Sequence, residues 1–209
     1  NETDSTLKDM HEYFRDRTPT EKNQYTGMFQ GKNLLLFTGE AFWIGAVNEQ
    51  YTPTLYKLAH SGFVFENFYN PLWYYSTVDG EYAATTGLIP TNQVNASQRY
   101  AGKNGVSMYF SMGNQLRALG YPTLAYHNNT ANYYDRNLSH PNLGYDFYAC
   151  DTGLDVAMTW PQSDLEMMQL TLPQALAGEK PFHNYYMTVS GHMNYSFAGN
   201  AMSAKHRDE

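Results

Sequence analysis

Residues 33–38 read Asn-Leu-Leu-Leu-Phe-Thr, a continuous apolar run that is followed by Gly39 and Glu40. A short apolar run next to glycine is typical of a strand that is buried on both faces of a sheet. The run therefore predicts a central strand, with the Glu40 carboxylate at its carboxyl end. Similar runs occur at 123–126, Thr-Leu-Ala-Tyr, and at 185–189, Tyr-Tyr-Met-Thr-Val.

Helices are predicted around these strands from their N-terminal caps, apolar spacing and glycine stops. The predicted helices cover residues 53–61, 77–86, 112–119, 131–138 and 164–177. Two further strands are predicted, at 63–69 and at 145–148. Strands that alternate with helices indicate an α/β fold with a mostly parallel central sheet flanked by helices.

The first 31 residues differ in character from the rest of the chain. Residues 1–31 are polar and charged, and the spacing at 7–14 predicts one weak amphipathic helix. We expect this segment to be a linker or docking arm. The apolar pattern begins at Lys32, so residues 32–209 are expected to belong to one folded domain.

Charge and cysteine content exclude several classes of protein. The net charge is −7, which argues against nucleic-acid binding because that function needs a basic surface. The single cysteine, Cys150, excludes disulfides within the chain and a Cys-rich zinc site. No run reaches the roughly 18 apolar residues that span a bilayer. We expect any anchor or export signal to precede Asn1.

Three polar side chains follow predicted strands, namely Glu40, His127 and His192. In parallel sheets, ligands bind outside the carboxyl ends of the strands. Thr77 begins a predicted helix, where free N–H groups and the helix dipole favour a phosphate. Hydroxyl and carboxylate oxygens suit Mg²⁺ or Mn²⁺, which activate a hydroxyl and polarise phosphoryl oxygens. Together these residues predict a phosphoryl-transfer site.

Each of these residues also has a simpler structural interpretation when it is taken alone. Glu40 is then a solvated loop residue, and Thr77 is a helix cap. His127 and His192 are hydrogen-bonded loop histidines, and Arg136 is a surface ion-pair partner. Only their joint order along the chain favours the site.

The ordered series of short motifs resembles the lipoteichoic acid synthase family of phosphoglycerol transferases, within the alkaline phosphatase/sulfatase superfamily. The matched stretches are residues 31–40, 52–55, 65–69, 76–82, 126–129, 133–136, 143–146, 181–182 and 188–192. They span nearly everything after Lys32. The resemblance implies a sulfatase-like fold for this part of the chain.

The resemblance also implies roles for individual residues. Glu40 corresponds to a metal ligand, and Thr77 to the nucleophile that also contacts the Mn²⁺ or Mg²⁺ ion. Four residues correspond to the family's substrate-binding positions: His127, Tyr134, Arg136 and His192. Tyr134 stands where the family usually carries Trp beside the bound glycerol phosphate, so an aromatic face is retained.

One part of the family pattern is absent. The family completes its metal site with an Asp–His pair well downstream of the position of His192. His206 and Asp208 follow His192 too soon, and in the wrong order, to be that pair. We therefore expect residues 32–209 to be the N-terminal portion of a catalytic domain whose C-terminal part is missing, and to be inactive alone.

The function implied by the resemblance is transfer of glycerol phosphate from phosphatidylglycerol to a cell-envelope polymer or glycolipid through Thr77. It implies action at the outer face of the bacterial membrane through a missing anchor, or in the cell wall or medium after release. Two alternatives stay open: a phosphodiesterase or sulfatase of the same superfamily, and a truncated lobe that binds substrate without turnover. The Cys/Ser-x-Pro-x-Arg motif of sulfatases does not follow Thr77, which disfavours a sulfatase.

Overall fold

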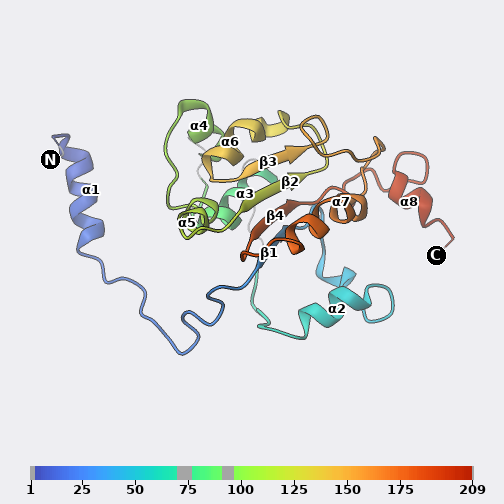
Figure 1. Ribbon diagram of the computed structural model, residues 1–209, viewed down its shortest axis with the longest axis horizontal. Helices are drawn as coiled ribbons and strands as arrows, with labels where there is room; N and C mark the ends of the chain where they lie inside the picture. Colours follow the sequence, from blue (N-terminus) through green and yellow to red (C-terminus); the bar gives the residue numbers. More distant parts are fainter. Residues whose placement is uncertain (1–2, 70–76, 91–96, 209) are drawn as a thin grey trace. The chain divides into compact units, whose positions relative to one another are not determined.

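The computed structural model describes residues 3–69, 77–90 and 97–208 (Figure 1). The chain divides into two compact units, residues 1–32 and residues 33–209. We describe each unit by itself.

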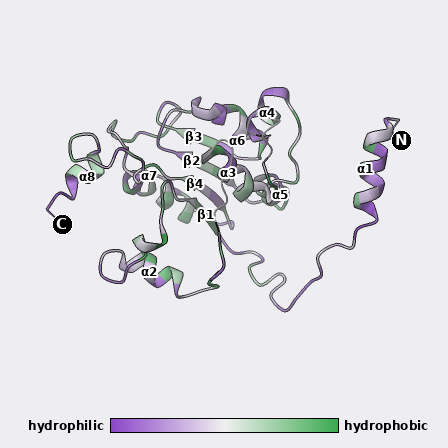
Figure 2. Cartoon of the chain, turned by 180° about the vertical axis from the view of Figure 1, so that it is seen from behind, coloured by the Kyte–Doolittle hydropathy of each residue, from purple (hydrophilic) through white to green (hydrophobic). Residues whose placement is uncertain are grey.

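The first unit contains one helix, α1 (Ser5–Arg15), followed by turns. The Asp4 side chain caps α1 by accepting hydrogen bonds from the N–H groups of Thr6 and Leu7. Every residue of α1 is exposed, and Figure 2 colours much of it hydrophilic. The short helix predicted in this segment is confirmed.

The second unit is built on a sheet of four parallel strands in the order β1-β4-β2-β3. The strands are β1 (Leu34–Thr38), β2 (Thr123–His127), β3 (Asp146–Ala149) and β4 (His183–Met187). Each parallel neighbour is reached through a crossover that contains helix, as parallel pairing requires. The predicted α/β fold with a mostly parallel sheet is confirmed.

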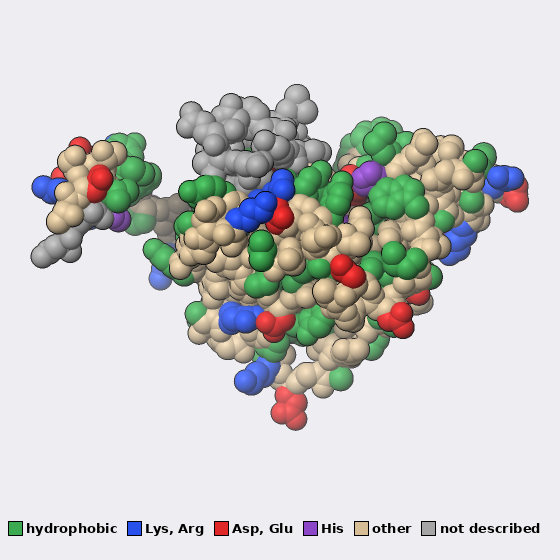
Figure 3. Space-filling model, turned by 90° about the horizontal axis from the view of Figure 1, so that it is seen from above, with side chains coloured by type: hydrophobic (Ala, Val, Ile, Leu, Met, Phe, Trp, Pro, Cys, Tyr) green, Lys and Arg blue, Asp and Glu red, His purple; other side chains and the backbone are tan. Residues whose placement is uncertain are grey.

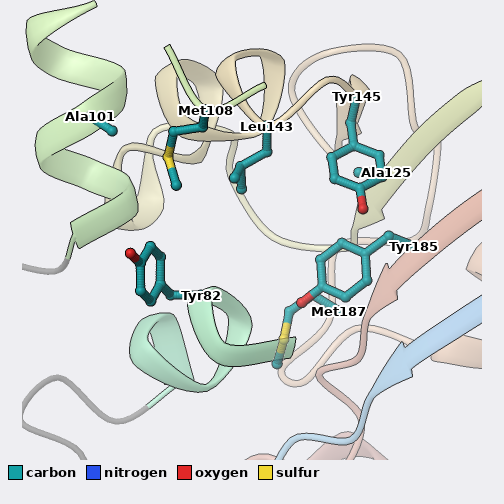
Figure 4. Close-up of a cluster of buried hydrophobic side chains, with 8 residues drawn as sticks. All are labelled: Tyr82, Ala101, Met108, Ala125, Leu143, Tyr145, Tyr185 and Met187. Atoms are coloured by element: carbon teal, nitrogen blue, oxygen red, sulfur yellow. The ribbon is translucent and has the colours of Figure 1, made fainter. Parts of the chain in front are cut away.

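Helices cover both faces of the sheet, because successive side chains of a strand point to opposite faces. Tyr185 and Met187 of β4 pack on one face with Tyr82 of α3 (Thr77–Thr86) and Ala101 of α4 (Ser97–Asn104), as Figure 4 shows. Tyr186 packs on the other face with Met167 of α7 (Asp164–Leu176). The unit therefore has three layers.

An aromatic row crosses the second of these faces. The ring of Tyr186 stacks on Phe37 at 5.2 Å and on Tyr126 at 5.1 Å, and Tyr126 stacks on Tyr148 at 5.6 Å. The parallel register places these four residues side by side on successive strands. Cross-strand aromatic pairs of this kind stabilise a sheet.

β4 is fully buried although its sequence, His-Asn-Tyr-Tyr-Met, is polar. Its polar groups are tolerated because they find partners inside the protein. Nδ1 of His183 donates to the carbonyl of Leu34, and the Tyr145 hydroxyl lies 2.9 Å from its Nε2. Tyr186 shares a hydrogen bond of 3.0 Å with Thr171 of α7. The sequence-based prediction placed this strand two residues too late because its polar beginning lacks an apolar signal.

The remaining elements are short. They are η1 (Ile44–Ala46), α2 (Pro53–Ala59), α5 (Met112–Ala118), η2 (Tyr133–Asp135), α6 (Arg136–Asn142) and α8 (Ala201–Lys205). Among the described helices, none combines the length and the apolar character needed to cross a bilayer. On the face shown in Figure 3, charged side chains are scattered singly or in small mixed groups among polar and apolar ones.

Two predicted elements differ from the structure. The strand expected at 63–69 is wrong: its described residues form turns and irregular chain, and Phe65 is 77% exposed. Aromatic residues favour a strand only where a partner strand is available, and no described strand pairs with this segment. The helix expected at 131–138 is instead a 3-10 turn, η2, followed by α6.

Candidate active site

A pocket of about 270 Å³ lies at the carboxyl edge of the sheet. It gathers residues at or just beyond the ends of β1, β2 and β4, together with the first residue of α3, two residues of η2 and the first residue of α6. The lining contains all six residues that the sequence singled out: Glu40, Thr77, His127, Tyr134, Arg136 and His192. It also contains side chains that the sequence did not single out, among them Asn129, Tyr133 and Trp160.

Glu40 and Thr77 are in direct contact. The Thr77 hydroxyl donates a hydrogen bond to Oε2 of Glu40 at 3.0 Å. Glu40 is fixed in turn, because its N–H donates to the hydroxyl of Thr188, which itself donates to the carbonyl of Thr38. Glu40 and Thr77, which the family resemblance assigns to the same metal ion, thus lie side by side. Ser76, the residue before Thr77 in that motif, lies outside the described residues.

His127 stands at the end of β2 and is buried. Its Nδ1 donates a hydrogen bond of 3.0 Å to the carbonyl of Met187. Burial, together with the nearby charge of Arg136, lowers the pKa of His127 to about 3. The imidazole is therefore neutral near pH 7, with its proton on Nδ1 and a lone pair on Nε2.

Arg136 begins α6 and is only 1% exposed. Its Nε lies 3.2 and 3.1 Å from the two carboxylate oxygens of Glu81, and its Nη2 lies 2.9 Å from Oε2. Nη1 donates to the carbonyl of Tyr133. Arg136 is therefore a buried ion-pair partner at the edge of the pocket, and the interpretation as a surface ion pair is wrong.

Glu81 is fully buried on α3, one helical turn after Thr77. Burial alone would raise the pKa of this carboxyl group, but Arg136 and His140 outweigh that effect and hold it well below its usual range. The Tyr185 hydroxyl donates a further hydrogen bond to Glu81 at 3.2 Å. The four-residue spacing between Thr77 and Glu81 could be seen in the sequence, but the contact of Glu81 with Arg136 on α6 could not.

The turn before Arg136 has an unusual backbone. Tyr134 and Asp135 both have left-handed conformations, with φ of 59° and 55°. Such residues cost about 1–3 kcal/mol each and persist only where their surroundings hold them. Asp135 is held by ion pairs to Arg99 at 2.6 Å and to Lys103 at 3.0 Å, both from α4. The turn brings the Tyr134 ring centre to 5.3 Å from the guanidinium carbon of Arg136.

His192 shares its side of the pocket with Trp160. Their ring centres are 5.0 Å apart, in an edge-to-face arrangement. The Trp160 indole N–H and Nδ1 of His192 both donate to the carbonyl of Met193. Trp160 lies in the loop before α7, and the only signal for it in the sequence was an isolated Trp next to Pro161.

Asp164 anchors the segment that leads to His192. Its two carboxylate oxygens accept hydrogen bonds from the N–H groups of Val189 at 2.9 Å and Ser190 at 2.8 Å. The Ser190 hydroxyl accepts a hydrogen bond from the N–H of Asp164 in return. The first residue of α7 thus fixes the chain between β4 and His192.

The donor atoms of the pocket decide which metal ion it can hold. Glu40 and Thr77 offer two hard oxygens, which is the donor chemistry that Mg²⁺ and Mn²⁺ prefer. Within the described residues, no group of three or more His, Cys, Asp or Glu side chains could hold a metal ion. The pair fits a divalent cation in donor type but not in ligand number.

Comparison with known proteins gives a consistent result. The chain is 23% identical over 206 residues to lipoteichoic acid synthase 2 of Bacillus subtilis (strain 168), a match that covers 91% of this chain and 30% of that protein. The fold is similar to the crystal structure of the lipoteichoic acid synthase LtaP from Listeria monocytogenes, with a TM-score of 0.74 and 23% identity. That match covers 90% of this chain and 48% of the LtaP chain.

The chain thus spans less than half the length of these two relatives. The family match runs from residue 32 to residue 208 and contains the whole sheet and the whole pocket. The chain belongs to the sulfatase family.

Proposed function

We propose that this domain is part of a phosphoglycerol transferase of the lipoteichoic acid synthase type, with Thr77 as its nucleophile. The observation that carries the proposal is the hydrogen bond of 3.0 Å from Thr77 to Glu40, in one pocket with Arg136 and two histidines. Two relatives named as lipoteichoic acid synthases support it.

The proposed first step is attack of the Thr77 oxygen on the phosphorus of phosphatidylglycerol. The bond from phosphorus to the diacylglycerol oxygen breaks, and that oxygen takes up a proton as diacylglycerol leaves. Thr77 loses its hydroxyl proton and becomes a glycerophospho-threonine. A threonine hydroxyl is a weak nucleophile at neutral pH. The Glu40 carboxylate, which accepts its hydrogen bond, orients the hydroxyl and favours departure of the proton.

The second step returns Thr77 to its starting state. A hydroxyl group of the acceptor polymer or glycolipid attacks the same phosphorus, the bond to the Thr77 oxygen breaks, and that oxygen is reprotonated. A hydrolase of the same superfamily differs only here, because water takes the place of the acceptor hydroxyl.

The chain offers complementary groups for the two halves of a glycerol phosphate. Arg136 uses three of its five N–H groups in contacts to Glu81 and Tyr133, which leaves two for phosphoryl oxygens. Nε2 of the neutral His127 accepts a hydrogen bond from a glycerol hydroxyl. The aromatic faces of Tyr134 and Trp160 provide apolar surface for the glycerol carbons.

Mn²⁺ or Mg²⁺ would be held by Glu40 and Thr77, and its remaining ligands would come from an Asp–His pair outside these residues. When bound, such a cation lowers the pKa of a coordinated hydroxyl and polarises phosphoryl oxygens. The proposed setting is the outer face of the bacterial membrane, where phosphatidylglycerol presents its headgroup.

The deciding experiment measures both products from fluorescent phosphatidylglycerol with the full-length protein. A transferase releases diacylglycerol and lengthens an acceptor, whereas a hydrolase releases diacylglycerol and free glycerol phosphate. Thr77→Ala should stop diacylglycerol release. Thr86→Ala is the matched control, since Thr86 lies on the same helix but outside the pocket lining, where its hydroxyl donates to the carbonyl of Tyr82 and accepts from the N–H of Leu88. Release at the wild-type rate by folded Thr77→Ala would overturn the proposal.

A further inference from the structure

We propose that Glu81 is a positioning residue that holds Arg136 in place relative to Thr77 and thereby sets the affinity of the pocket for a phosphoryl group. The inference rests on the proposed function, because it takes Arg136 and Thr77 as the groups that meet the phosphate. Glu81 itself does not line the pocket. Its effect on a ligand is therefore transmitted through Arg136.

Glu81 is tied to Thr77 by the geometry of α3. The two residues are four positions apart in one helix, so they lie on the same face, about 6 Å apart along the axis. Glu81 is tied to Arg136 by the three contacts between 2.9 and 3.2 Å described above. A change in the position of this carboxylate therefore moves the guanidinium relative to the nucleophile.

A second set of contacts links Glu81 to β1, the strand that ends two residues before Glu40. The Tyr185 hydroxyl of β4 donates to Oε1 of Glu81 and lies 3.0 Å from the hydroxyl of Thr38, the last residue of β1. Since the one phenol proton points to Glu81, the Thr38 hydroxyl is the donor in that second contact. Glu81 thus joins α3, α6 and β4 directly, and β1 through Tyr185.

The charges explain why a carboxylate is needed at this position. Arg136 and Glu81 are both almost wholly buried, and a buried guanidinium requires a counter-charge. Among the described ion pairs, Glu81 is the carboxylate that contacts Arg136. Glu40 supplies the carboxylate among the residues that line the pocket. Without the charge of Glu81, Arg136 would be drawn toward Glu40 and away from the position in which it receives a phosphoryl oxygen.

The test compares Glu81→Gln with wild type in the full-length protein, with binding of sn-glycerol 3-phosphate and of inorganic phosphate measured by calorimetry. We expect Glu81→Gln to weaken both by about 10-fold and to raise KM for phosphatidylglycerol similarly, with kcat changed by less than about 3-fold, because a ground-state contact is lost. Glu81→Asp, which keeps the charge on a shorter side chain, should recover part of the affinity. Glu179→Gln, at an exposed site before β4, is the control.

A purely structural role would give a different result. Glu81→Gln would then lower the melting temperature but leave the folded protein with wild-type affinity and KM, and this outcome overturns the inference. If Glu81→Gln fails to fold, Tyr185→Phe provides the second test, because it removes only the hydroxyl that donates to Glu81. We expect Tyr185→Phe to weaken phosphate binding by about 2- to 3-fold. Unchanged phosphate binding in both Tyr185→Phe and Glu81→Asp would overturn the inference.

The two proposals can fail separately. If wild type binds phosphate and Glu81→Gln weakens that binding, but phosphatidylglycerol is not turned over, the proposed function fails and the positioning role stands. If wild type turns over phosphatidylglycerol and Glu81→Gln changes neither binding nor KM, the positioning role fails and the proposed function stands.

Discussion

The hydroxyl of Thr77 donates to the carboxylate of Glu40 at 3.0 Å, although the two residues are 37 positions apart in the chain. The contact joins the first residue of α3 to the residue two positions beyond β1. It depends on the parallel sheet, because that topology brings the ends of successive strands and the starts of their helices to one edge.

The structure predicts that Thr77 and Arg136 differ in what their removal does to stability. Thr77→Ala should lower turnover by about 10⁴-fold or more but cost only about 1 kcal/mol of unfolding free energy, as for one lost side-chain hydrogen bond. Arg136→Ala should cost about 3–5 kcal/mol, because it leaves Glu81 buried without a counter-charge. Urea unfolding of both variants checks this. Equal stabilities would show that the Arg136–Glu81 pair is not buried as described.

Metal binding by residues 1–209 alone should be weak. Glu40 and Thr77 supply two oxygen ligands, whereas Mg²⁺ and Mn²⁺ prefer about six ligands in octahedral geometry. We expect titration calorimetry with MnCl₂ to give a Kd of about 1 mM or weaker, and Glu40→Gln to abolish the signal. A tight, stoichiometric isotherm would mean that ligands within this chain were overlooked.

Stability should fall as the pH drops below about 6.5. The pKa of His127 is lowered from 6.5 to about 3 in the folded protein, and burial also lowers that of His183. At acidic pH the unfolded chain binds protons at these two histidines, whereas the folded chain keeps them neutral. The stabilising contribution of each histidine is therefore complete above pH 6.5 and is lost as the pH falls. For His127 the loss approaches about 1.4 kcal/mol per pH unit between its unfolded and folded pKa values.

Urea unfolding at pH 7.5, 6.5, 5.5 and 4.5 measures this dependence. His127→Gln should reduce the slope between pH 6.5 and 4.5, with His206→Gln, at an exposed position, as the control. Identical slopes for wild type and His127→Gln would contradict the neutral, buried state of this imidazole.

Trp160 should contribute to ligand binding through its ring. The side chain lines the pocket, is 42% exposed and packs edge-to-face on His192. Trp160→Ala should weaken glycerol phosphate binding by about 3- to 10-fold, whereas Trp160→Phe, which keeps an aromatic face, should lose less. The chain has three Trp residues, so quenching of fluorescence by glycerol phosphate that is seen in wild type and lost in Trp160→Phe gives an independent measurement. An unchanged affinity in Trp160→Ala would show that Trp160 does not contribute to ligand binding.

The parts of the site that were predictable share one physical property. Glu40, His127 and Thr77 stand at the ends of elements with a clear apolar pattern or cap, and the topology of a parallel sheet then places them together. His192 was likewise predicted from its place after a strand, and the resemblance to a known family added Arg136 and Tyr134. Local pattern and motif thus located the edge of the sheet and most of the pocket.

The parts that were not predictable depend on contacts between distant segments. Glu81 matters because of Arg136 and Tyr185, which come from two other elements. Trp160 lies in an irregular loop, where the sequence has neither helix nor strand periodicity. The strand expected at 63–69 failed for the same reason, since a strand requires a partner that local sequence does not specify. The beginning of β4 was not predicted because His183 and Asn184 are polar, and their burial depends on neighbouring strands.

The stacked rings of Phe37, Tyr186, Tyr126 and Tyr148 also make the sheet visible to spectroscopy. Aromatic chromophores held this close in a fixed orientation give near-ultraviolet circular dichroism, a signal that disappears when side-chain packing is lost while helices persist. The chain has 19 Tyr, 11 Phe and 3 Trp in all, so this row contributes part of the signal, and loss of packing on the sheet should reduce the signal while the helical signal persists. Near-ultraviolet circular dichroism therefore distinguishes a variant whose sheet has loosened from a variant that keeps its packing and has lost only its activity.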